Sequence, residues 1–101
     1  MFIDRRVFPV KMGCMEEAVA LVKGAIEGNK SYKHGYRIYT PEIGPFDVLV
    51  VEWEYESLEE QQRVWAAWFA RPDTPTFAEK WNKVVERGGG SEIWNLVAHR
   101  A

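Results

Sequence analysis

The pattern of hydrophobic and polar positions along the chain predicts four strands and an intervening set of helices. Residues 2–10, 32–40, 46–55 and 92–99 are rich in β-branched and aromatic side chains, which is typical of strands. Residues 15–27 carry apolar side chains at spacings of three and four, which predicts an amphipathic helix.

A second helical region is predicted between the third and fourth strands. Ser57 followed three residues later by Glu60 forms a capping-box pattern, and the helix that follows ends before Pro72. Pro75 begins a further helical stretch, and residues 88–90, three consecutive glycines, end it as a flexible connector. The aromatic residues in these helices, Trp65 and Trp68 among them, follow helical spacing and are interpreted as core.

The order β-α-β-β-α-β predicts an α+β, ferredoxin-like fold with an antiparallel sheet, formed by one domain over residues 1–101. Right-handed crossovers place both helical regions on the same face of such a sheet. Residues 48–51 are all apolar, so this strand presents apolar side chains to both faces of the sheet, and the face without helices must also be covered. We therefore expect a homodimer that packs through this open sheet face.

Three segments of the chain resemble the NIPSNAP family. Residues 2–13 carry an acidic residue, an arginine two positions on, an aromatic residue and a closing glycine; residues 41–45 resemble its Thr-Glu-Ile-Gly turn, and residues 52–57 its Trp-x-Tyr-Glu-Ser strand end. The resemblance implies a dimeric α/β barrel, often with a cavity in each protomer. The wider superfamily includes cofactor-independent monooxygenases, haem-degrading enzymes and small isomerases. Val51 stands where relatives often carry a histidine, which weakens any transfer of acid/base chemistry.

Charge and cysteine content exclude several classes of function. The net charge is -2 and no block of Lys and Arg occurs, so nucleic-acid binding is not expected. The longest strongly apolar run, residues 48–51, is too short to span a membrane, and residues 1–10 carry three charges, unlike a signal peptide. The single cysteine, Cys14, favours a reducing, cytoplasmic setting.

No cofactor or metal ion is expected either. The two histidines, His34 and His99, lack metal-ligand spacing, and His34 is interpreted as a solvated surface residue. Haem-degrading members of the superfamily that the chain resembles typically use an Asn on the first strand and a His on a later helix. Here the first strand carries charged residues and neither histidine belongs to a later helix, so a haem monooxygenase is disfavoured.

Four residues are the candidates for ligand binding: Arg6, Asp4, Tyr39 and Trp53. Asp4 and Arg6 share one face of the first strand, where the Arg6 guanidinium either binds a ligand carbonyl or carboxylate or forms a structural ion pair with Asp4 or Glu52. Trp53 either walls a cavity and stacks on a planar ligand or packs in a dimer core. Tyr39 is preferred to Tyr36 because the family resemblance favours it.

Two functions stay open at this stage, and no catalytic residue is assigned. The first is a binding protein for a small hydrophobic molecule, without chemistry. The second is a cofactor-independent monooxygenase or isomerase that acts on a hydrophobic carbonyl or aromatic compound. An enclosed cavity of roughly 300 Å³ or more with Arg6 and Trp53 on its wall would favour ligand chemistry, whereas a space filled by Trp and Leu side chains would favour a scaffold.

Overall fold

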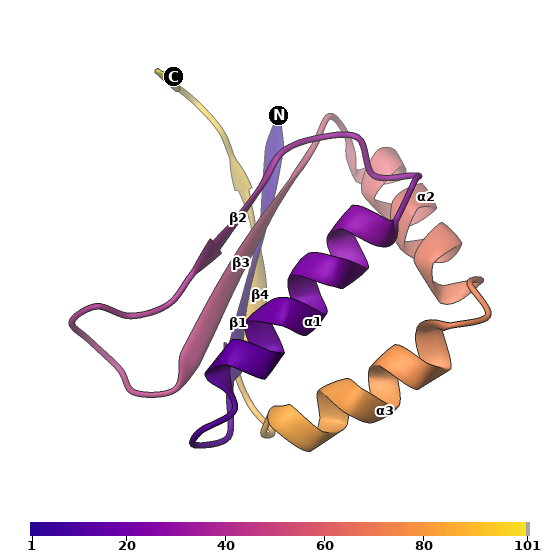
Figure 1. The fold of residues 1–101 in the computed structure, drawn as a ribbon. Coiled ribbons are helices and arrows are strands. Elements are labelled where there is room, and N and C mark those ends of the chain that lie inside the picture. The colour runs from indigo at the N-terminus through magenta and orange to yellow at the C-terminus, as the bar shows by residue number, and fades with distance from the viewer. Residues whose placement is uncertain (101) are drawn as a thin grey trace.

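The computed structural model describes residues 1–100, which form four strands and three helices (Figure 1). In chain order the elements are β1 (Phe2–Pro9), α1 (Met15–Gly28), β2 (Tyr36–Tyr39), β3 (Val48–Tyr55), α2 (Leu58–Phe69), α3 (Thr74–Val84) and β4 (Gly90–Asn95). The strands form one sheet in the order β2-β3-β1-β4, and every neighbouring pair is antiparallel. This topology confirms the predicted α+β, ferredoxin-like fold.

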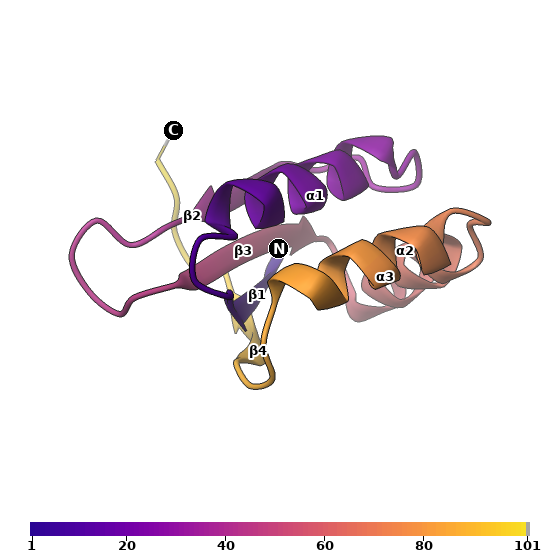
Figure 2. The same ribbon diagram turned by 60° about the horizontal axis from the view of Figure 1, so that its bottom comes forward.

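The three helices lie on one side of the sheet. α1 crosses in front of the strands in Figure 1, α2 and α3 follow beside it, and the turned view in Figure 2 places all three on the same side. α1 packs against α3, and α2 contacts β3. The opposite side carries no helix from the described residues. None of the helices in residues 1–100 has the length and apolar content needed to cross a bilayer.

The strand register determines which side chains share a face of the sheet. Asp4 of β1 lies opposite Trp53 of β3, and both point towards the helices, as Arg6 does two residues along. Arg5 lies opposite Glu52 and points the other way. We call these two sides the helix-covered face and the open face. The buried core lies between the helix-covered face and the helices, and its members are Val10, Ala18, Val22, Ile26, Leu49, Val51, Trp53, Tyr55, Val64 and Val84.

α2 begins where the capping pattern predicts. The Ser57 hydroxyl accepts a hydrogen bond from the Glu60 backbone N–H at 3.1 Å, which satisfies one of the free donors of the first turn. The Glu60 carboxylate in turn accepts from the Glu56 backbone N–H at 2.8 Å. Pro75 lies in the first turn of α3, as predicted.

The limits of three strands differ from the predicted ones by two residues or more, and the smallest difference is in β3, which was expected over residues 46–55 and begins at Val48. The strand expected over residues 32–40 is only Tyr36–Tyr39, because residues 29–35 form the turn that leaves α1. The strand expected over residues 92–99 spans Gly90–Asn95, since its partner β1 begins at Phe2, opposite Asn95. Beyond that point Val97 is almost fully exposed.

The open face is less apolar than residues 48–51 suggest. Val48 and Val50 do point to this side, but they are followed on β3 by Glu52 and Glu54. These two carboxylates pair with arginines, Glu52 with Arg5 at 3.8 Å and Glu54 with Arg37 at 3.8 Å. The open face therefore has an apolar end and a charged end.

The two glycines that precede β4, Gly88 and Gly89, let the chain pass close to β1. Gly88 and Gly89 both have positive φ angles, of 111° and 80°. A Cβ atom on Gly89 would overlap the backbone carbonyl of Val7 on β1. Glycine is therefore the residue that lets the chain pass this close to β1 before it pairs.

Candidate functional site

A cavity of about 280 Å³ lies between the helix-covered face and the three helices and opens to solvent beside Phe69, which is 69% exposed. Nine of the residues that line it are aromatic, and they come from every layer of the fold: Phe8, Tyr32, Trp53, Tyr55, Trp65, Trp68, Phe69, Phe77 and Trp81. Arg6 and Trp53 both lie on its wall. The space between helices and sheet is thus not filled by side chains.

The helices present their aromatic residues to this cavity through simple helical spacing. On α2, Trp65 and Trp68 are three residues apart and Phe69 follows, so all three lie on one side of the helix. On α3, Phe77 and Trp81 are four residues apart, and their rings stack with centroids 5.7 Å apart. These rings pack against each other and leave an apolar wall towards the sheet.

Arg6 places a charged group in this apolar wall. Its Nε donates to Asp4 Oδ1 at 3.2 Å and its Nη2 donates to Asp4 Oδ2 at 3.4 Å, so the carboxylate holds the guanidinium along one edge. The centre of the guanidinium lies 4.3 Å from the centroid of the Trp65 ring and 5.9 Å from that of Trp53. Arg6 is therefore held by one ion pair and two aromatic faces.

Asp4 lies behind Arg6 and does not line the cavity. Its side chain is 1% exposed, and Gln61 Nε2 donates a third hydrogen bond to its Oδ2 at 3.1 Å. Gln61 stands four residues before Trp65, so one side of α2 supplies both the amide that binds Asp4 and the ring that covers Arg6. Of the two ion pairs considered for Arg6 from the sequence, the pair with Asp4 forms.

Two tyrosines complete the sheet side of the cavity. Burial raises the pKa of Tyr32 to about 12, and its hydroxyl accepts a hydrogen bond from the Glu54 backbone N–H at 2.7 Å. Burial also raises the pKa of Tyr55, and the negative charge of Asp4 adds to that shift. Both tyrosines are therefore neutral near physiological pH and act as polar, uncharged groups.

Tyr39 lies apart from the other three candidate residues. It points to the open face, where its hydroxyl donates to Glu52 Oε1 at 2.9 Å. Tyr36 points to the helix-covered face but donates to Glu27, and neither tyrosine lines the cavity. Arg6 and Trp53 thus share the cavity wall, Asp4 supports it from behind, and Tyr39 belongs to a different surface.

The remaining polar candidates lie outside the cavity. His34 is not a solvated surface residue, because its Nε2 lies 2.9 Å from Glu60 Oε1 beside the start of α2. Cys14 stands at the start of α1 and is partly buried. The glycines at 88–90 do not line the cavity either. Among residues 1–100 no group of three His, Cys, Asp or Glu side chains is arranged to hold a metal ion.

The residues that sequence reasoning missed are mostly on α2 and α3. Trp65 and Trp68 were predicted to be core, but both line the cavity, and Trp65 covers Arg6. An apolar stripe on a helix has the same spacing whether it meets packed side chains or a cavity, so periodicity could not distinguish the two. Gln61 carries no sequence signal that would connect it with Asp4, which is 57 residues away.

Comparisons with known proteins bear on both the fold and the site. The NIPSNAP family profile matches residues 3–92. A solved protein from Agrobacterium tumefaciens is 26% identical, with a TM-score of 0.81 over 94% of this chain and 92% of that one. An uncharacterized NIPSNAP domain protein from Burkholderia xenovorans is 17% identical, with a TM-score of 0.78 over 100% and 99% of the two chains.

A more distant likeness concerns a named enzyme class. A putative antibiotic biosynthesis monooxygenase from Chloroflexus aurantiacus is 10% identical, with a TM-score of 0.75 over 99% of this chain and 96% of that one. At this identity the likeness concerns the fold alone. No curated protein matches the chain.

Proposed function

This chain belongs to the NIPSNAP family, and on that premise we propose that it binds a small hydrophobic molecule in the cavity beneath its helices. The observation that carries the proposal is the cavity itself, about 280 Å³ with nine aromatic residues on its wall. An apolar cavity of about 150 Å³ already accommodates benzene, so this one has room for two fused rings. Concave, largely apolar sites with a few polar groups are typical of small-molecule binding.

Binding without chemistry fits the lining better than catalysis does. Within residues 1–100 the lining contains no imidazole and no carboxylate, the groups that most often transfer protons. Tyr32 and Tyr55 are protonated at neutral pH with their ordinary pKa, and burial raises the pKa of each further, so neither supplies a base. A cofactor-independent monooxygenase or isomerase acting on a hydrophobic carbonyl or aromatic compound is the alternative, and Arg6 is the feature that favours it, since a fixed donor can stabilise developing negative charge.

Filling the cavity tests the binding proposal. Both alanines are exposed, but Ala78 on α3 lines the open side of the cavity, whereas Ala66 on α2 does not line it. We expect Ala78→Phe to weaken the binding of 2-methylnaphthalene by at least about tenfold, measured by quenching of tryptophan fluorescence, and Ala66→Phe to leave it unchanged. Equal binding by wild type and Ala78→Phe would show that the cavity is not the site.

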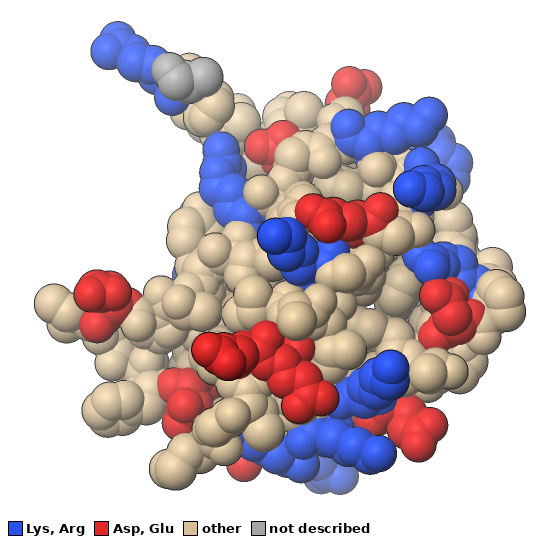
Figure 3. Space-filling model, viewed as in Figure 1, with Lys and Arg blue, Asp and Glu red and all other residues tan. Residues whose placement is uncertain are grey.

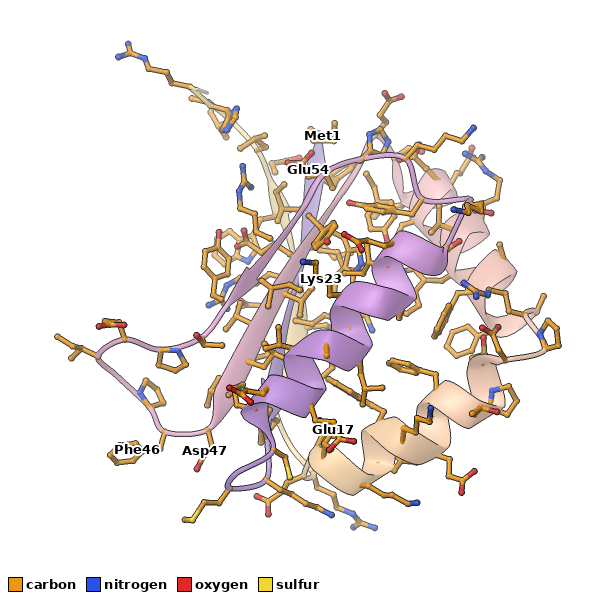
Figure 4. All side chains as sticks on the ribbon, viewed as in Figure 1. Met1, Glu17, Lys23, Phe46, Asp47 and Glu54 are labelled. Atoms are coloured by element: carbon orange, nitrogen blue, oxygen red, sulfur yellow. The ribbon has the colours of Figure 1, made fainter. Side chains whose placement is uncertain are left out.

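We also propose that two copies of the chain pack through the open face to form a dimeric α/β barrel. Val7, Val48 and Val50 supply an apolar end to this face. Near it, the β2–β3 loop extends beyond the body of the protein (Figures 1 and 4), with Ile43 97% and Phe46 93% exposed. Exposed apolar side chains that lie together are typical of protein interfaces.

Sedimentation equilibrium tests this dimer. Val50→Glu places a charge at the centre of the apolar end, and we expect it to shift the mass from dimer to monomer. Met12→Glu adds the same charge at an 89% exposed position in the turn after β1, and we expect it to keep the wild-type mass. A wild-type mass that stays monomeric at all concentrations would contradict the proposal.

Two further expectations from the sequence stay predictions. One domain over residues 1–101 and a cytoplasmic setting both agree with the single cysteine and the ordinary composition.

On the side of the molecule seen in Figure 3, Lys and Arg are interspersed with Asp and Glu, and no large patch of one sign covers that side. This distribution agrees with the expectation that nucleic acid is not a partner.

A further inference from the structure

Arg6 is the only normally charged residue that lines the cavity within residues 1–100, but its charge is already compensated. The Asp4 carboxylate lies along one edge of the guanidinium and takes hydrogen bonds from Nε and Nη2. Because Asp4 is 1% exposed, water screens this pair poorly and the compensation is strong. The cavity therefore contains hydrogen-bond donors but close to no net charge.

Asp4 is also fixed in place, so a ligand cannot easily displace it. Gln61 donates to the same oxygen, Oδ2, that accepts from Arg6 Nη2. The Trp65 ring covers the guanidinium and restricts its movement. Displacing Asp4 would leave a carboxylate buried without its partner, which is costly.

These contacts leave part of the guanidinium available to a ligand. Among residues 1–100, no protein group accepts a hydrogen bond from Arg6 Nη1, and the Arg6 side chain is 29% exposed on the cavity wall. A neutral carbonyl oxygen could accept from Nη1 without bringing a charge. A carboxylate at the same place would gain from Arg6 but would be repelled by Asp4 and would lose its hydration.

We propose that Asp4 determines the charge of the ligand: by compensating Arg6 it makes the cavity select neutral aromatic carbonyl compounds and reject carboxylates of the same shape. Asp4 acts through Arg6 and touches no ligand, so it is a positioning residue. This inference rests on the proposed function, because it needs a cavity that binds ligands. It adds the chemical class of the ligand and the residue that sets it.

A pair of probes with the same ring system tests the selection in the wild-type protein. 2-Naphthamide is neutral and 2-naphthoate is ionised at neutral pH, while both offer a carbonyl oxygen on two fused rings. We expect the dissociation constant for 2-naphthamide, measured by isothermal titration calorimetry, to be at least about tenfold lower than that for 2-naphthoate. Equal binding, or tighter binding of the naphthoate, would overturn the inference.

Asp4→Asn supplies the second test, because it keeps the shape of the side chain and removes its charge. Arg6 then faces the cavity uncompensated, and we expect the preference to move towards 2-naphthoate by at least about tenfold. Asp47→Asn is the matched control, since Asp47 lies in the β2–β3 loop (Figure 4) and does not line the cavity. An unchanged ratio in folded Asp4→Asn would overturn the inference. The ratio of the two dissociation constants reports ligand selection and not folding. If Asp4→Asn does not fold, the comparison of the two probes in the wild type alone decides whether the inference holds.

The neutral probe 2-methylnaphthalene separates this inference from the proposed function. If it binds to the wild type but the amide shows no advantage over the carboxylate, the cavity is a ligand site and only the role of Asp4 is wrong. If neither it nor the two naphthalene carbonyl probes bind, the proposed function and the inference are both wrong.

Discussion

The two faces of the sheet hold the same kind of ion pair in opposite surroundings. Arg5 and Arg6 are neighbours on β1, and strand alternation sends one to each face. On the helix-covered face, Arg6 binds the carboxylate of Asp4, which is 1% exposed. The Arg6 guanidinium also lies 4.3 Å from the Trp65 ring centroid. On the open face, Arg5 lies 3.8 Å from Glu52 with its own side chain 37% exposed. Burial, and not residue type, separates a pair that shapes a cavity from a pair that faces solvent.

Breaking the ion pairs of one residue on each face gives the largest expected contrast. Asp4→Ala leaves the partly buried Arg6 without its partner, and we expect it to lower the free energy of unfolding by about 3–5 kcal/mol. Arg5→Ala breaks two solvent-screened pairs, with Glu52 and with Glu92, and should cost about 0–1 kcal/mol. Urea unfolding measures both values, and similar losses in the two variants would contradict the comparison.

Apolar neighbours on β3 extend the contrast to packing. Leu49 is fully buried on the helix-covered face, so Leu49→Ala should cost about 3 kcal/mol. Val50 points to the open face and is only partly buried, so Val50→Ala should cost less than about 1 kcal/mol in the monomer. A larger loss for Val50→Ala at high protein concentration than at low concentration would indicate that a second copy covers this residue. Urea titrations at two concentrations provide the measurement.

Alkaline pH should affect the helix-covered face first. Burial raises the Tyr32 pKa from its usual 10.0 to about 12, so the folded state holds its proton more tightly than the unfolded state does. The stabilisation from this group is complete below pH 10 and is lost as the pH rises from 10 to about 12. We expect Tyr32→Phe to reduce this loss, measured as unfolding free energy against pH. Tyr39→Phe on the open face serves as the comparison: burial and the hydrogen bond to Glu52 also raise the Tyr39 pKa, but less than burial raises that of Tyr32, so we expect a smaller reduction there, and an equal one would contradict the prediction.

The elements of the fold could be predicted because they depend on neighbouring residues. The pattern of Ser57 and Glu60 predicted the start of α2, and apolar spacing predicted α1 to within one residue. The ends of β2 and β4 were wrong because a strand ends where its partner ends, and that partner is far away in the chain. Asn95 lies opposite Phe2, and nothing near Asn95 in the sequence shows this.

The candidate site was predictable in part for the same reason. Alternation along one strand placed Asp4 and Arg6 on the same side, and of the two places considered for Trp53, a cavity wall and a dimer core, the structure has it lining the cavity with Arg6. The exposure of each group depends on packing, which a single sequence does not show. Trp65 therefore looked like an ordinary core residue, and the support that Gln61 gives to Asp4 could not be anticipated.

The crossing at Gly89 sets a limit on how this sequence can change over evolution. A single methyl group there would meet the Val7 carbonyl, so no substitution is silent while β4 stays paired with β1. Homologues that retain this pairing should retain glycine at this position even where their cavities have come to hold different molecules. An invariant glycine here would then record inheritance of the sheet and carry no information about the ligand.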